Sequence, residues 1–134
     1  MKLSSRGHYG LRAMIELANS FGKGPVALAE IADQEKLSVA YLEQLFAALK
    51  KSGLVESTRG TRGGYELTRQ PAQVSVGEIV RALEGPIAPV ECDSEGAGAR
   101  CCEREGKCPS QLVWQRMADS IAGVLDSTML ADLC

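Results

Sequence analysis

The chain has 134 residues, of which 45% are hydrophobic, 24% charged and 4% aromatic. This length and composition fit one compact globular domain, or a small domain with an appendage. No apolar run is long enough to span a membrane, and charged residues interrupt the N-terminal segment where a signal peptide needs its apolar core. We therefore expect a cytoplasmic protein with no membrane association.

The charges are divided unevenly along the chain. Residues 1–70 contain ten Lys and Arg and seven Asp and Glu, a net charge of +3, whereas residues 71–134 contain five and ten, a net charge of −5. Together these give the overall net charge of −2. A basic half beside an acidic half suggests that only the first half approaches phosphate.

The N-terminal segment has the pattern of two helices. Apolar residues at helical spacing predict a first helix over 5–21, and the Gly and Pro residues within 22–25 end it. A short second helix is predicted over 26–34. The apolar residues expected on the buried face of the first helix are Leu11, Met14, Ile15, Ala18 and Phe21.

A capped third helix completes a helix-turn-helix pattern. Lys36 and Leu37 are predicted to form a tight link, and Ser38 is a good N-cap for a helix over 39–52. Gly53 then ends this helix in the position that glycine usually takes. A helix, a short turn and a capped second helix are typical of helix-turn-helix proteins.

Residues 54–68, LVESTRGTRGGYELT, predict a β-hairpin. The first strand begins at Leu54 and Val55, the second ends with Tyr65 and Leu67, and RGTRGG between them forms a flexible basic tip. A hairpin directly after the recognition helix is the wing of a winged helix-turn-helix.

Two further helices follow the hairpin. Ser75 and Glu78 have the spacing of a capping box at the start of a helix over 76–84, which Gly85 stops. A last helix is predicted over about 110–127. Its apolar residues are Leu112, Trp114, Met117, Ile121, Val124 and Leu125.

The segment at 86–109 is a polar, glycine-rich loop with clustered thiols. It contains Cys92, Cys101, Cys102 and Cys108, and a fifth cysteine, Cys134, is the last residue. Few apolar residues surround these thiols, so they are not expected to fill a core. Clustered thiols on a polar loop of an intracellular protein usually indicate a metal site, an iron–sulfur site or a redox switch.

Several residues of the third helix and the hairpin are candidates for DNA contact. Gln44 can pair with adenine through two hydrogen bonds, and Glu43 can accept one from cytosine N4, or both can simply solvate an exposed helix face. Arg59 and Arg62 lie among glycines that allow close approach to a minor groove, although such a tip is often only a surface turn. The residues that a recognition helix places at base edges are here Ser38, Ala40, Tyr41, Glu43 and Gln44.

Longer motifs extend this prediction to nearly the whole chain. MKLSSRGHYGLRAM, YLEQLF, GLV, RGTRGGY and VSVGEIVRALEG, followed by the loop cysteines and a Trp-containing last helix, resemble the Rrf-type bacterial winged-helix regulators, especially iron–sulfur repressors of the IscR and NsrR kinds. The resemblance implies a mainly α fold with a small β-hairpin: a winged helix-turn-helix domain at 1–85, a cluster-binding loop at 86–109, and a dimerisation helix and tail at 110–134. It also implies a homodimer, mainly a repressor, on pseudo-palindromic double-stranded DNA.

The resemblance further implies an iron–sulfur cluster held by Cys92, Cys102 and Cys108, with [2Fe–2S] favoured over [4Fe–4S]. Operator binding would then respond to iron–sulfur or iron status, redox state or nitric oxide. IscR-like members have a fourth ligand, a His three residues after the last Cys, where this chain has Gln111. NsrR-like members use an Asp near the N-terminus, where this chain has His8. His8 and Cys101 are therefore the candidates for the fourth ligand.

Other uses of the thiols stay open. In one, Cys101 or Cys102 pairs with Cys92 or Cys108 under oxidant or sulfane sulfur, which makes a cluster-free redox-switch repressor. A structural zinc site is less favoured, because the spacing differs from paired C-x₂-C knuckles. Regulation of an enzyme partner is a further alternative, and Cys134 is interpreted as an incidental thiol. No Ser/His/Asp set, phosphate-binding loop or carboxylate pair predicts an enzyme.

Overall fold

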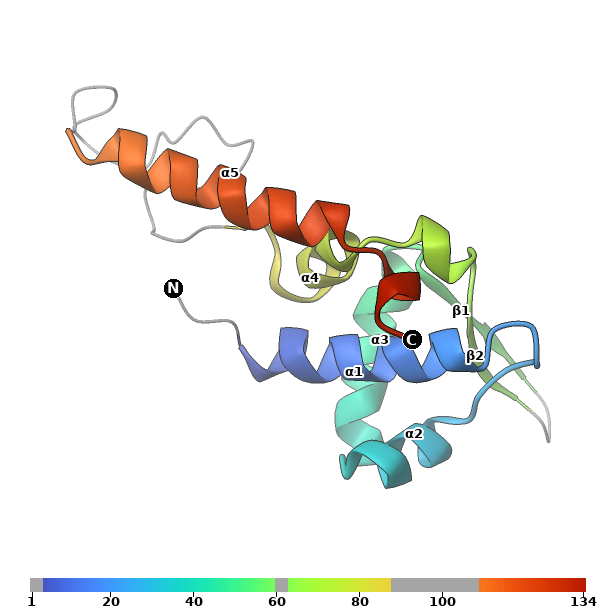
Figure 1. Ribbon diagram of the computed structural model, residues 1–134. Helices are drawn as coiled ribbons and strands as arrows, with labels where there is room; N and C mark the ends of the chain where they lie inside the picture. Colours follow the sequence, from blue (N-terminus) through green and yellow to red (C-terminus); the bar gives the residue numbers. More distant parts are fainter. Residues whose placement is uncertain (1–3, 60–62, 88–108) are drawn as a thin grey trace.

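A computed structural model describes residues 4–59, 63–87 and 109–134 of the chain (Figure 1). The fold is mainly helical with one small antiparallel hairpin, which confirms the predicted fold class. Within the described ranges, no helix combines the length and the apolar character needed to cross a membrane. The elements are α1 (Ser5–Asn19), α2 (Leu28–Glu35), α3 (Val39–Lys51), β1 (Val55–Thr58), β2 (Gly64–Leu67), α4 (Val76–Glu84) and α5 (Gln111–Ser127), with 3₁₀ turns η1 (Pro71–Gln73) and η2 (Leu130–Asp132).

The turn between α2 and α3 is as tight as the sequence predicts. Lys36 adopts a left-handed conformation with φ of 55°, and the Leu37 backbone N–H donates to the Ala32 carbonyl at 3.0 Å. Ser38 caps α3, because its hydroxyl oxygen accepts from the Tyr41 N–H at 3.1 Å. These local contacts define the relative direction of the two helices of the helix-turn-helix.

The hairpin gains a third short partner that sequence analysis missed. Val26 forms an isolated antiparallel bridge with Tyr65, whose two N–H···O bonds measure 2.9 and 2.8 Å. A side chain at Gly64 would collide with the Val26 carbonyl, so glycine permits this close approach. The prediction that the second helix begins at residue 26 was therefore wrong, because Val26 pairs with the wing and α2 begins at Leu28.

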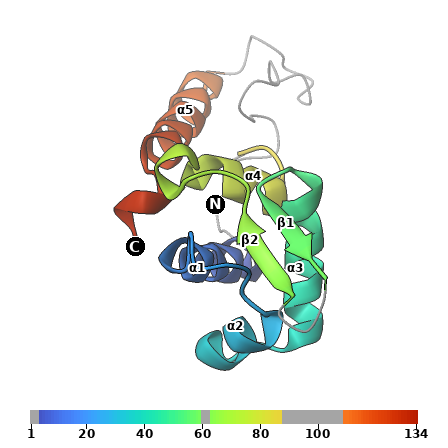
Figure 2. The ribbon, with the colours of Figure 1, turned by 90° about the vertical axis from the view of Figure 1, so that its right-hand side faces the viewer.

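The core lies between α1, α2, α3 and α4, with the hairpin closing one side (Figure 2). Phe46 is fully buried and its ring lies 4.9 Å from that of Tyr65. The expectation that Phe21 faces inward was wrong, because α1 ends at Asn19 and Phe21 is 43% exposed. Fully or almost fully buried members of the core include Met14, Leu17, Ile31, Leu42, Leu45, Phe46, Leu49 and Ile79.

The end of the chain returns to this core after α5. The Val76 N–H donates to the Thr128 carbonyl at 2.9 Å, and the Leu130 N–H donates to the Val74 carbonyl at 2.8 Å. Leu130 is fully buried within the main core. By contrast, α5 packs against α4 near its C-terminal end, and its first turns project beyond the rest of the described fold (Figure 1). Ala118 is its one buried residue.

Candidate nucleic-acid interface and cysteine loop

The first half of α3 presents a polar face to solvent. Ala40, Glu43 and Gln44 are exposed, whereas Leu42 and Leu45 on the opposite side are fully buried. Ser38 is exposed beside this face, and its hydroxyl oxygen accepts a hydrogen bond from the Tyr41 N–H. Ser38 therefore also caps the helix. The arrangement leaves Glu43 and Gln44 accessible to a double helix.

Tyr41 differs from its neighbours because it is half-buried. Its hydroxyl lies 3.2 Å from the Ser5 hydroxyl, and its ring meets the Tyr9 ring edge-on with centroids 6.3 Å apart. The recognition helix is therefore tied to the beginning of α1. The His8 ring packs 5.1 Å from the Tyr9 ring, and the His8 side chain is exposed.

The wing begins beside the end of α3. Lys50 donates from its ammonium group to the Ser57 hydroxyl at 2.9 Å, which joins the last turn of α3 to β1. Arg59 is exposed beyond β1, on the approach to the tip of the hairpin. Arg62 lies outside the described residues, so only Arg59 of the two predicted wing arginines is placed.

The cysteine loop lies outside the described residues, including Cys92, Cys101, Cys102 and Cys108. Cys134 is described and has a free, exposed thiol. Within 4–59, 63–87 and 109–134, no three His, Cys, Asp or Glu side chains lie together as a metal site would need. Of the predicted cluster ligands, only His8 falls within the described residues, and it lies on an exposed face of α1.

The last turn of α4, which leads into the loop, is anchored on the start of α1. The Ser4 N–H donates to the Glu84 carboxylate at 2.7 Å. A helix N-terminus leaves backbone N–H groups without intrahelical partners, and α1 has no acidic residue in its own first turn, so Glu84 supplies the negative charge from α4. Gly7 permits the approach, because a side chain there would collide with the Glu84 carboxylate.

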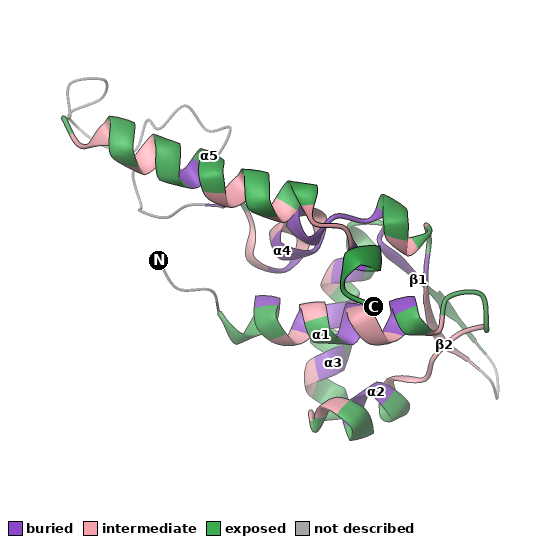
Figure 3. Ribbon diagram, viewed as in Figure 1, coloured by how far each residue is buried: buried purple, intermediate pink, exposed green. Residues whose placement is uncertain are grey.

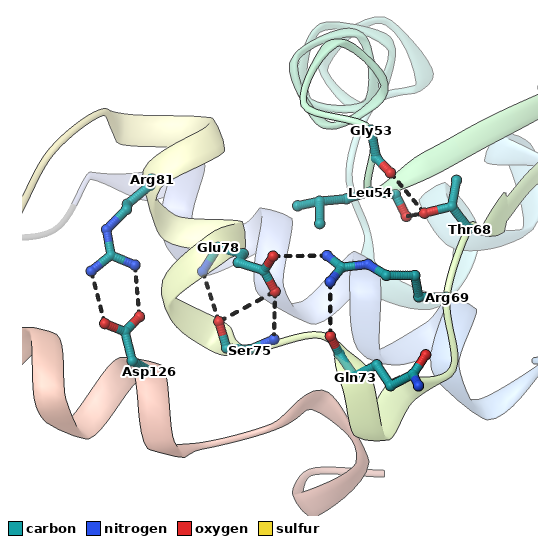
Figure 4. Close-up of polar contacts among 9 residues, drawn as sticks. All are labelled: Gly53, Leu54, Thr68, Arg69, Gln73, Ser75, Glu78, Arg81 and Asp126. Carbon is teal, nitrogen blue, oxygen red and sulfur yellow. Dashed lines mark hydrogen bonds and ion pairs between the residues drawn. The ribbon is translucent and has the colours of Figure 1, made fainter.

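A second polar cluster fixes the start of α4 (Figure 4). Glu78 and Ser75 form the predicted capping box, and Arg69 donates to the Glu78 carboxylate at 2.8 Å and to the Gln73 carbonyl at 3.0 Å. Burial raises the pKa of Glu78, but the hydrogen bonds from Ser75 and Arg69 outweigh it and leave the pKa below its usual value. This cluster joins the segment after β2 to the start of α4.

The buried faces of α1, α3 and α4, the exposed polar start of α3 and the hairpin behind it define a winged-helix DNA-binding protein. The model of the Rrf2 family, described as an iron-dependent transcriptional regulator, matches residues 3–134. The chain belongs to the Rrf2 family, and it is a transcriptional regulator and not an enzyme.

Similar proteins of the family include two kinds of regulator. The chain is 47% identical to CymR of Bacillus subtilis over 133 residues, covering 99% of this chain and 89% of CymR. The solved structure of that protein, the global cysteine regulator of B. subtilis, has a TM-score of 0.80 at 46% identity and covers 99% and 95% of the two chains.

IscR of T. potens matches with a TM-score of 0.79 at 44% identity, covering 99% of this chain and 85% of that chain. An oxidized form of Staphylococcus aureus CymR matches with a TM-score of 0.76 at 40% identity, covering 97% and 93%.

Proposed function

We propose that this Rrf2 regulator binds a pseudo-palindromic operator as a homodimer in the cytoplasm, and that the sulfur chemistry of its loop cysteines controls the binding. The observation that carries the DNA-binding part is the exposed polar start of α3 on a helix whose opposite side is fully buried. Such a helix can enter a major groove without disturbing the core.

The base-reading residues are proposed to be Glu43 and Gln44, with Arg59 and Arg62 at the minor groove and Ser38, Ala40 and Tyr41 completing the contact surface. Replacing Gln44 with Ala should weaken binding to an operator duplex selected in vitro by about 1–3 kcal/mol, and it should relax the base preference at one position of that duplex. The matched control is Gln34→Ala, an exposed glutamine on α2, which should leave affinity unchanged. Equal effects of the two substitutions would contradict base readout by Gln44.

The homodimer is proposed to form through α5. Four large apolar side chains on this helix are exposed: Leu112 (67%), Val113 (56%), Met117 (38%) and Val124 (65%). The same helix also has a shallow apolar depression, which is lined by Ser120, Ile121, Val124 and Leu125. An exposed apolar surface of this kind usually marks an interface, and a second α5 supplies an apolar surface to match it.

Control by thiol oxidation is the first candidate for the regulatory chemistry. It is supported by the 47% identity to CymR, a regulator of cysteine, and by the likeness to a CymR that has been solved in an oxidized form. Cys101 or Cys102 would pair with Cys92 or Cys108. With hydrogen peroxide as oxidant, one S–S bond forms, the O–O bond breaks, and the two thiol protons and two electrons leave in two molecules of water.

An iron–sulfur cluster is the second candidate, supported by the family's description as iron-dependent and by the 44% identity to IscR. The donor set fits, because thiolates of Cys92, Cys102 and Cys108 are the usual ligands of such clusters and the loop around them is polar. His8 or Cys101 would complete the site, with [2Fe–2S] favoured over [4Fe–4S]. When bound, the cluster would supply redox and nitric oxide sensitivity and would order the loop.

The contacts at the base of the loop offer a route from either chemistry to DNA. Glu84, in the last turn before the loop, holds the Ser4 N–H, and the adjacent Ser5 hydroxyl contacts the Tyr41 hydroxyl of α3. A change of loop conformation that moves Glu84 would therefore act on the start of α1 and then on the recognition helix. A ligand or a disulfide shifts the populations of two such arrangements only if it stabilises one of them more than the other.

One experiment separates the two candidates. The protein is purified without oxygen and assayed for iron and acid-labile sulfide. It is then titrated with hydrogen peroxide. At each step, mass spectrometry of alkylated peptides measures the free thiols, and operator affinity is measured in parallel. Iron and sulfide in matching amounts support the cluster, whereas a metal-free protein with a reversible loop disulfide that tracks affinity supports the thiol switch. The double substitution of Cys92→Ser and Cys108→Ser should abolish either response, and Cys134→Ser, the control, should abolish neither. A metal-free protein with unreactive thiols would overturn both.

A further inference from the structure

An ion pair joins α4 to α5, and neither of its residues belongs to the proposed DNA-binding surface. Arg81 of α4 donates two hydrogen bonds to the carboxylate of Asp126 in α5, at 2.6 and 3.0 Å (Figure 4). The two partners lie far apart in sequence, and they meet where the last turns of α5 cross α4. Two parallel bonds from a planar guanidinium hold a carboxylate in one orientation.

Gly77 leaves room for this ion pair at the start of α4. A Cβ atom built there would collide with the Asp126 carboxylate and would lie 2.7 Å from the Arg81 guanidinium. We call Gly77, Arg81 and Asp126 the α4–α5 clasp. A side chain at Gly77 would displace Asp126 or Arg81, so the ion pair that joins α5 to α4 depends on the glycine.

The segment after α5 supplies a second fixed point next to the clasp. Thr128 closes the end of α5 by donating from its hydroxyl to the Val124 carbonyl at 2.8 Å, and its own carbonyl accepts from Val76 at 2.9 Å. Leu130 is then fully buried in the main core. The C-terminal end of α5 is thus attached to the winged-helix unit, while Leu112 and Val113 at the other end are exposed.

We propose that the α4–α5 clasp sets the angle at which α5 leaves the winged-helix unit, and thereby the separation of operator half-sites that the dimer accepts. The inference rests on the proposed dimerisation through α5. A helix of 17 residues is about 25 Å long at 1.5 Å per residue. A rotation of roughly 5° at the clasp therefore moves the far end by about 2 Å, which is comparable with the ~3.4 Å rise of one base pair.

The exposure of the pair indicates a geometric role more than a stabilising one. The side chains of Arg81 and Asp126 are 31% and 48% exposed, and ion pairs at such positions contribute little to folding stability. Removing the pair should therefore leave a folded protein whose α5 is free to adopt other angles. Arg69 and Glu78 provide a matched comparison, since they form an ion pair of similar exposure that joins the segment after β2 to α4.

The test is an in vitro selection from random DNA duplexes, carried out separately with the unchanged chain, Asp126→Asn, Gly77→Ala and the control Arg69→Gln. The separation of half-sites in the selected duplexes is compared, and affinities are measured for duplexes with one base pair added or removed. Thermal melting and sedimentation check that each variant is a folded dimer. If Gly77→Ala does not fold, Asp126→Asn carries the test alone.

We expect Asp126→Asn and Gly77→Ala to prefer a different separation, or to lose the roughly tenfold preference of the unchanged chain for its own separation. Arg69→Gln should keep that preference. Folded clasp variants that select the same separation with the same preference would overturn the inference and leave the proposed function standing. An unchanged chain that selects no paired half-sites would overturn the proposed function, and the inference with it.

Discussion

The winged-helix unit and α5 differ in what they bury. The unit formed by α1 to α4 and the hairpin encloses a continuous core whose largest members are fully buried. In contrast, most of α5 is exposed or intermediate (Figure 3). It buries Ala118 alone and exposes four large apolar side chains. The first region therefore encloses its own core, whereas the exposed side chains of the second fit the proposed dimer interface. Leu130 and the α4–α5 clasp connect the two regions.

Loss of the largest core side chain should have the greatest effect. Phe46→Ala removes a fully buried ring that packs on Tyr65, and we expect the free energy of unfolding to fall by about 3–5 kcal/mol. Urea denaturation followed by circular dichroism measures it. Phe21→Ala is the control, because Phe21 is 43% exposed and should cost less than about 1 kcal/mol. Similar costs for the two would show that the core is not where the structure places it.

Leu130 tests whether the tail belongs to the winged-helix unit. It is fully buried in the main core although it follows α5 in sequence, so Leu130→Ala should lower the free energy of unfolding by about 2–4 kcal/mol. Leu133→Ala, at a position 42% exposed, should have a much smaller effect. A loss at Leu130 no larger than that at Leu133 would mean that the tail is not docked in solution.

The exposed face of α5 should matter for association and not for the fold. Val124→Lys places a charge at a position that is 65% exposed, so the helical content should be retained while the dimer weakens at least about tenfold. Sedimentation equilibrium measures the dissociation constant. Ala47→Lys, an exposed position on α3, should leave it unchanged. A dimer unaffected by Val124→Lys would place the interface elsewhere.

The capping cluster of α4 predicts a small pH dependence. Because the folded pKa of Glu78 lies below its unfolded value, the ionised carboxylate contributes stability above the unfolded pKa, and this stability is lost as the pH falls through the folded pKa. The partial exposure of the pair limits the effect to less than about 1 kcal/mol. Glu78→Gln should flatten the acid limb of the stability profile below pH ~4.5. An acid limb of unchanged slope would refute the contribution.

The elements that sequence analysis predicted correctly depend on residues close together in the chain. Ser38 caps α3, Ser75 and Glu78 form the capping box, and Gly53 has the positive φ of 79° that a helix end favours. Each signal acts over about one helical turn, so composition and spacing suffice to find it. The exposure of Glu43 and Gln44 likewise follows from the helical period once Leu42 and Leu45 are recognised as buried. The roles of the loop cysteines stay predictions.

What sequence alone left undecided depends on residues that are distant in the chain. The bridge from Val26 to Tyr65, the contact of Glu84 with Ser4, the ion pair of Arg81 with Asp126 and the burial of Leu130 leave no periodic or local trace. The Arg81 and Asp126 positions are 45 residues apart, and Ser4 and Glu84 are 80 apart. Local propensity determined which segments are helices and strands, whereas only packing around one core decided which of them meet and at what angle.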